Sequence, residues 1–146
     1  MSGAIAIEAV RKTVSVDCSI EEAFRIFTED ATSWWPVETH SINGAGSEVV
    51  FEGHEGGKVY DLAPDGKKGH WATVVAWEPP NRLVLAWEVS PRSTGTEVEV
   101  RFTAEDGATR VDLEHRGWER VPEPDERDSY DTGWDFVLER YAGGLG

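Results

Sequence analysis

Apolar and polar residues alternate through most of the middle of the chain, and this alternation predicts an antiparallel sheet. In residues 96–103 and 109–115 nearly every second position is apolar, and the positions between them are mostly charged. Successive side chains of a strand point to opposite faces, so both segments predict strands with one buried and one solvated face. Further strands are predicted at residues 5–16, 48–52, 57–62, 69–77 and 82–89.

Two short helices are predicted between the first and second strands. Ser19 and Glu22 have the spacing of a capping box, in which the serine hydroxyl accepts from the backbone N–H at position 22. Apolar residues follow at helical spacing and predict the first short helix. A second helical stretch is predicted at residues 29–35, where Pro36 ends it.

A long helix is predicted after the last strand. Its apolar stripe recurs at steps of three and four residues and consists of Tyr130, Trp134, Val137, Leu138 and Tyr141. The pattern predicts a helix over residues 126–142 that ends at Gly143 and Gly144. A run of strands bracketed by helices indicates the α+β class rather than alternating α/β.

The size and charge of the chain limit its partners. Its 146 residues fit one domain, residues 1–146, and the net charge of −14 predicts repulsion from nucleic acids and anionic membranes. The single Cys18 cannot form an intramolecular disulfide, and no stretch approaches 18 consecutive apolar residues. The first residues have no secretory signal pattern. We therefore expect a soluble, cytoplasmic protein that binds neither nucleic acid nor membrane.

Several motifs, in this order and spacing, resemble a known family. They include Trp34-Trp35-Pro36, Trp77-Glu78-Pro79-Pro80-Asn81-Arg82-Leu83 and His115-Arg116-Gly117-Trp118. The sequence resembles the activator of heat-shock-protein-90 ATPase homologues, within the START and birch-pollen-allergen-like (SRPBCC) superfamily. The resemblance implies the helix-grip fold, a strongly curved antiparallel sheet wrapped around a long C-terminal helix, with two short helices after the first strand. The superfamily includes lipid carriers, plant-hormone receptors, aromatase/cyclases and co-chaperone domains.

Seven tryptophans in one small domain are the main compositional signal. Large rings either fill the space between sheet and helix or line an apolar cavity with few polar groups. We expect a small apolar or aromatic ligand there, with Trp87 and Trp134 as walls, Trp35 and His40 near the entrance, and His115 orienting a polar atom. The full set of expected ligand-binding residues is Trp35, His40, Trp87, Val100, Phe102, Leu113, His115 and Trp134.

Other interpretations remain open. An inward His115 is either a core histidine satisfied by a backbone carbonyl or a general acid/base of a cyclase or hydratase, with Tyr60 and Tyr130 as candidate second groups. The predominantly acidic stretch 112–139 is either a solvated face or a docking site for a basic protein surface. The four histidines lack the pairing of metal ligands, so we expect no metal and no cofactor.

Overall fold

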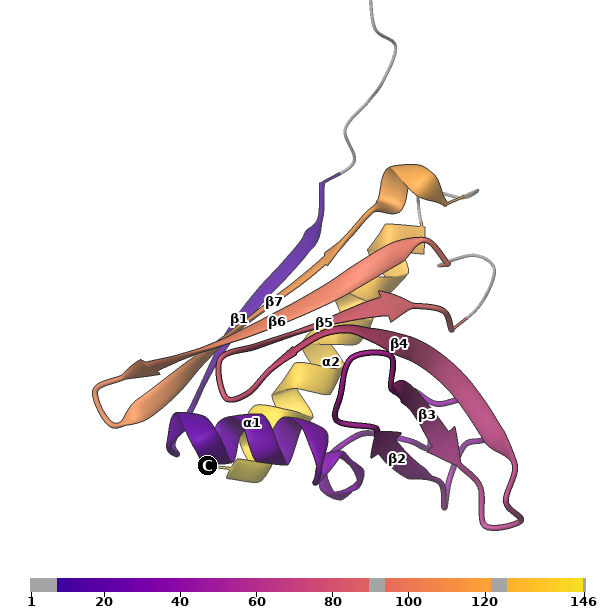
Figure 1. Ribbon diagram of the computed structural model, residues 1–146, viewed down its shortest axis with the longest axis horizontal. Helices are drawn as coiled ribbons and strands as arrows, with labels where there is room; N and C mark the ends of the chain where they lie inside the picture. The colour runs from indigo at the N-terminus through magenta and orange to yellow at the C-terminus, as the bar shows by residue number, and fades with distance from the viewer. Residues whose placement is uncertain (1–7, 90–93, 122–125, 146) are drawn as a thin grey trace, which may run out of the picture.

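One strongly curled sheet of seven strands forms the body of the protein (Figure 1). The computed structural model describes residues 8–89, 94–121 and 126–145. Neighbouring strands are antiparallel throughout and follow the order β1-β7-β6-β5-β4-β3-β2. The strands are β1 (Val10–Val16), β2 (Glu48–Phe51), β3 (Lys58–Leu62), β4 (Lys68–Glu78), β5 (Arg82–Trp87), β6 (Thr96–Glu105) and β7 (Ala108–Arg116). The α+β class and the predicted strands are confirmed, although β1 begins at Val10 and residues 5–7 lie outside the described part.

The short helices follow β1 as predicted. Helix α1 (Ile20–Thr28) starts at Ser19, whose hydroxyl accepts from the backbone N–H of Glu22 at 3.2 Å. The second helical stretch is a single 3-10 turn, η1 (Ala31–Ser33). A further 3-10 turn, η2 (Trp118–Arg120), follows β7 and was not predicted.

The long helix α2 (Glu126–Leu145) continues past its predicted end. Gly143 and Gly144 lie within it, so the prediction that they end the helix was wrong. A glycine costs only about 1 kcal/mol relative to alanine inside a helix, which weakens the helix without breaking it. Among the described helices, none is long and apolar enough to cross a membrane.

Helix α2 lies along the inner face of the curled sheet, which is the helix-grip arrangement (Figure 1). Lys12 of β1 ties the two layers together, since its Nζ lies 2.9 Å from carboxylates of both Asp131 and Asp135. At the other end of α2, the Tyr141 hydroxyl donates to the Ala23 carbonyl of α1 at 2.8 Å. The core fills the space between these elements, and the predicted inward face of β7 is confirmed by the burial of Val111, Leu113 and His115. That core positions the cavity described below.

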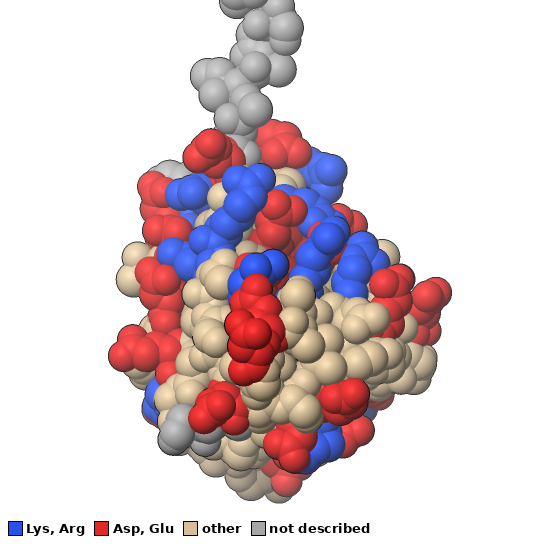
Figure 2. Space-filling view, turned by 90° about the vertical axis from the view of Figure 1, so that its left-hand side faces the viewer, with Lys and Arg blue, Asp and Glu red and all other residues tan. Residues whose placement is uncertain are grey.

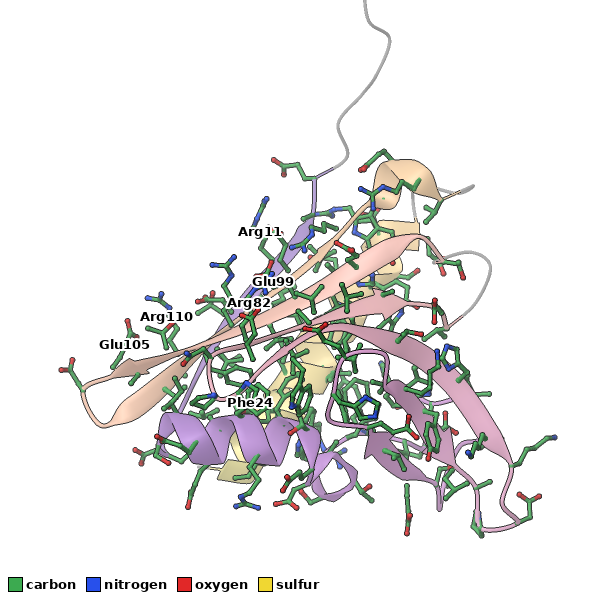
Figure 3. All side chains as sticks on the ribbon, in the orientation of Figure 1. Arg11, Phe24, Arg82, Glu99, Glu105 and Arg110 are labelled. Carbon is green, nitrogen blue, oxygen red and sulfur yellow. The ribbon has the colours of Figure 1, made fainter. Side chains whose placement is uncertain are left out.

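The outer face of the sheet carries paired charges rather than a patch of one sign. Figure 2 shows basic and acidic side chains interleaved over the upper part of that view. Glu99 is the exception to the solvated face predicted for β6, because only 6% of it is exposed. Its carboxylate accepts from Arg82 at 2.7 Å (both labelled in Figure 3). It also accepts from Arg101 and Arg116 at 2.6 Å each. Burial alone raises the pKa of Glu99, but these three bonds outweigh it and lower the pKa to about 2.

Replacing the buried carboxylate tests this cluster. Glu99→Gln is expected to lower the free energy of unfolding by about 1–3 kcal/mol at neutral pH, because three arginines lose their shared anion. The matched control is Glu105→Gln, whose ion pair with Arg110 is about half exposed on both sides and is expected to matter by less than about 0.5 kcal/mol (Figure 3). Chemical denaturation measures both, and equal effects would contradict the importance of burial.

Candidate ligand-binding site

A cavity of about 220 Å³ lies beside α2, bounded by β4, β5 and the loop that follows η1. Most of its surface is aromatic or aliphatic, and the described residues that line it include no Lys, Arg, Asp or Glu. The lining residues are Trp35, Thr39, His40, Ser41, Ile42, Trp71, Trp87, Val89, Tyr130, Gly133, Trp134 and Val137. Each element contributes at least one ring, so the site depends on the whole fold.

Four tryptophans form a continuous wall of the cavity. The Trp35 ring centroid lies 4.9 Å from that of Trp71 and 6.0 Å from that of Trp134. Trp87 completes the wall, because its ring centroid lies 6.4 Å from that of Trp71 and 5.6 Å from that of Trp134. Tyr130 adds a fifth ring at 6.3 Å from Trp87, nearly perpendicular to it. These spacings and tilts are those of favourable aromatic packing, so the wall is pre-formed.

The indole N–H groups of this wall are all bonded to the protein. Trp35 donates to the backbone carbonyl of His40, and Trp71 donates to the carboxylate of Asp61. Trp87 donates to the Tyr130 hydroxyl and Trp134 donates to Nδ1 of His115, each at 3.0 Å. Indole nitrogen can only donate, so each N–H is already committed and the rings offer a ligand their carbon surface.

A buried carboxylate holds the loop at the rim of the cavity. Asp61 of β3 is fully buried and accepts from the backbone N–H groups of Ile42 at 3.0 Å and Asn43 at 2.8 Å. It also accepts from Trp71 Nε1 at 2.5 Å, so both the loop and the wall depend on it. The loop approaches the neighbouring strand so closely that a Cβ on Gly69 would lie 2.5 Å from the Ile42 side chain. Any larger side chain at position 69 would clash with the loop, which explains the glycine there.

His40 lies at the rim, between the loop and α2. Its ring packs on Phe136 with centroids 5.0 Å apart, and its Nδ1 is 2.7 Å from the Thr39 hydroxyl. Burial lowers the pKa of His40, with Glu38 opposing the shift more weakly. The imidazole is therefore neutral near pH 7 and can exchange a hydrogen bond with a ligand.

His115 lies outside the cavity lining and is fully buried. Because Trp134 Nε1 must donate to its Nδ1, the proton of the neutral ring belongs on Nε2, which lies 2.8 Å from the Thr96 hydroxyl. Trp118 covers the ring, with centroids 4.3 Å apart. Desolvation lowers the pKa of His115 to about 3. Both nitrogens are engaged in the core, as in the interpretation of His115 as a core histidine, but their partners are side chains rather than a backbone carbonyl.

This environment gives little support to acid/base catalysis by His115. Tyr130 packs its ring edge-on against His115 at 4.9 Å, but the imidazole nitrogens are bonded to Thr96 and Trp134 instead. Tyr60 lies on β3, where the Lys68 ammonium sits over its ring. Neither tyrosine therefore completes a catalytic pair with His115.

The expected ligand-binding residues divide into two groups in the structure. Trp35, His40, Trp87 and Trp134 meet around the cavity. Val100, Phe102, Leu113 and His115 are buried in the packed core and do not line it. Phe102 illustrates the reason, because Phe24 and Phe27 of α1 cover it at centroid distances of 5.1 and 5.8 Å (Figure 3 labels Phe24). These four residues support the cavity walls rather than forming them.

Trp71, Tyr130 and Asp61 are the main residues missing from the expected set. The inward position of Asp61 could have been predicted from the sequence, because it lies two positions after the apolar Val59 in a predicted strand and so shares its face. An acid at such a position requires hydrogen-bond partners and indicates a structural or binding role. Nothing in the sequence pattern distinguished Trp71, as a cavity residue, from the other tryptophans. Among the described residues, no three His, Cys, Asp or Glu side chains are placed to hold a metal ion.

Comparisons with known proteins agree with this architecture. The family described as Activator of Hsp90 ATPase homolog 1-like protein matches residues 17–143. Comparison with curated proteins gives no significant match.

Solved structures of similar fold cover nearly the whole chain. CalC from Micromonospora echinospora, described as a self-sacrificing resistance protein, has 26% identity and a TM-score of 0.71, covering 95% of this chain and 94% of its own. The anthrahydroquino-gamma-pyrone synthase Txn09, complexed with SUM, has 26% identity and a TM-score of 0.61, covering 94% and 97%. The Aha1 dimer from Colwellia psychrerythraea has 17% identity and a TM-score of 0.70, covering 94% and 95%, and shows the fold alone.

Proposed function

Because the chain belongs to the family of activator of Hsp90 ATPase homolog 1-like proteins, whose fold commonly binds ligands, we propose that it binds a small apolar or aromatic ligand beside α2. The observation that carries the proposal is the convergence of four tryptophans and Tyr130 on one cavity. Apolar walls with a few polar groups are typical of small-molecule sites. Neutral His40 supplies such a polar group at the rim.

The size of the cavity limits the ligand. Sites for drug-sized molecules usually measure about 300–1,000 Å³, whereas this cavity measures about 220 Å³. A compound of one ring, or one end of a larger molecule, fits that volume. The complex reported for Txn09, at 26% identity, supports a ligand-holding role on this fold. It does not identify the ligand of this chain.

Two alternatives have less support. Catalysis by His115 requires a histidine that reaches a substrate, and this one is sealed in the core. Docking to a basic protein surface would use the acids of residues 112–139, but several of these already pair within the chain: Glu114 with Arg116, and Asp131 and Asp135 with Lys12. The cavity is therefore the better-supported site.

A substitution at Gly133 of α2 tests ligand binding in the cavity without removing a core side chain. Gly133→Leu is expected to weaken binding of small neutral aromatic compounds by about tenfold or more, because the new side chain enters the cavity. Toluene, phenol and benzyl alcohol are suitable probes, followed by titration calorimetry and tryptophan fluorescence. Leucine also favours a helix more than glycine, so the variant should remain folded.

Gly133→Ala is the matched control. An added Cβ would lie 3.9 Å from His40 Nε2, which is ordinary contact, so alanine leaves the cavity nearly intact. We expect unchanged binding and about 1 kcal/mol of added stability. Equal binding by the leucine and alanine variants would place the ligand elsewhere, and a wild-type protein that binds neither these probes nor a small organic cation would remove the proposal.

A further inference from the structure

We propose that the natural ligand carries an alkylated ammonium group, which binds against the tryptophan wall of this cavity. The inference rests on the proposed function, because it names the chemical class of the ligand of the same site. Three independent features support it: the ring surface offered by the wall, the buried carboxylate behind Trp71, and the charges of the surroundings.

The wall suits a cation better than an anion. An ammonium ion is attracted to the negatively charged face of an aromatic ring, most strongly to that of tryptophan. An anion or a carbonyl oxygen needs hydrogen-bond donors, but the four indole N–H groups are committed to protein acceptors. The wall therefore offers a ligand aromatic surface rather than N–H groups.

The Asp61 carboxylate strengthens this preference. Both of its oxygens accept hydrogen bonds, from Trp71 Nε1 and from the backbone of Ile42 and Asn43, as an ionised carboxylate does. Asp61 takes part in none of the ion pairs that the described residues form, so no basic side chain among those residues compensates its charge. A carboxylate bonded to an indole N–H polarises the ring and makes its π surface more negative.

The surroundings also favour a positive ligand. The described lining residues include no lysine or arginine, and burial keeps His40 neutral near pH 7, so this described part of the rim adds no positive charge. The net charge of −14 raises the local concentration of cations around the protein. The volume of about 220 Å³ is suited to a compact group such as trimethylammonium rather than to an extended apolar molecule.

The test compares two probes of the same shape on the full chain. Choline and its neutral carbon isostere, 3,3-dimethylbutan-1-ol, differ in the charge of one central atom. We expect choline to bind about tenfold more tightly in titration calorimetry, against sodium chloride at matched ionic strength. Its N-methyl proton resonances should also shift upfield on binding, because ring currents act on groups held over aromatic faces.

Trp71→Phe separates the charge effect from shape. Phenylalanine keeps an apolar wall with a weaker attraction for cations, so the preference for choline over the isostere should fall about threefold or more. Trp77→Phe is the matched control, since Trp77 packs on Phe24 outside the cavity and should leave the preference unchanged. If Trp71→Phe unfolds, Trp35→Phe tests the same point.

Each outcome distinguishes the two proposals. Equal or tighter binding of the isostere, or binding of the neutral aromatic probes without choline, would overturn the cation inference and leave the cavity as a ligand site. A preference for choline that survives both Trp71→Phe and Trp35→Phe would also overturn it. Failure of every probe to bind would overturn the cation inference and the proposed function together.

Discussion

Lowering the pH from 7 to 4 is expected to reduce the free energy of unfolding by roughly 3 kcal/mol through His115 alone. Burial lowers the pKa of His115 to about 3 in the folded protein, whereas an unfolded histidine titrates near its usual value of about 6.5. Between these values the unfolded chain binds a proton that the folded protein does not. Stability from this residue is therefore fully present above about pH 6.5 and is lost as the pH falls toward 3.

The physical reason lies in the two hydrogen bonds of the ring. Protonation places a hydrogen on Nδ1, opposite the N–H of Trp134, and converts an attractive contact into a repulsive one. The charge would also lie in a site with no exposed surface. The cavity wall depends on the same bond, so acid should weaken ligand binding along with stability.

His115→Gln isolates this contribution. We expect the variant to be less stable at pH 7 but to lose the slope of about 1 kcal/mol per pH unit that His115 contributes between pH 6 and 5. Denaturant titrations at several pH values measure this slope. His54→Gln, at an exposed histidine, should keep it. A wild-type and a His115→Gln protein with equal slopes would show that His115 is not held neutral. The comparison with wild type is needed because the pKa of His40 is also lowered in the folded protein, so His40 also contributes to the loss of stability at low pH.

The local sequence pattern was sufficient to predict the strands and the orientation of their side chains. A period of two residues fixes which positions share a face, so Leu113 and His115 were correctly placed inward. The N-cap at Ser19 depends on two residues three positions apart, Ser19 and Glu22, and was predicted equally well. Glycines near the end of α2 were misread because the free-energy cost of glycine in a helix is small.

The cavity itself could not be predicted in the same way. Val100 and Trp87 are both inward on adjacent strands, yet only Trp87 borders the open space, because helix α1 and helix α2 cover different parts of the sheet. Which inward residue is packed and which is accessible depends on those long-range contacts. The environments of Asp61 and Glu99 also arise from residues distant in the sequence, so their burial required the structure.

Removing the charge of Asp61 is expected to have a comparably large effect on stability. In Asp61→Asn one oxygen becomes an NH₂ group that faces a donor, either the Trp71 indole or a backbone N–H of the loop. A buried donor without an acceptor costs about 1–3 kcal/mol, and a donor facing a donor costs more. We expect the free energy of unfolding to fall by about 2–4 kcal/mol.

Asp65→Asn is the matched control for this change. Asp65 is exposed in the turn between β3 and β4, and an asparagine oxygen can still accept from the Lys67 N–H. We expect an effect below about 0.5 kcal/mol. Hydrogen exchange adds a local readout, since the amides of Ile42 and Asn43 should exchange faster in Asp61→Asn even where the rest of the sheet is protected. Unchanged protection of both amides would contradict the role of Asp61 in holding the rim, whereas faster exchange with weaker ligand binding would show that this buried carboxylate supports the cavity through the rim loop and Trp71.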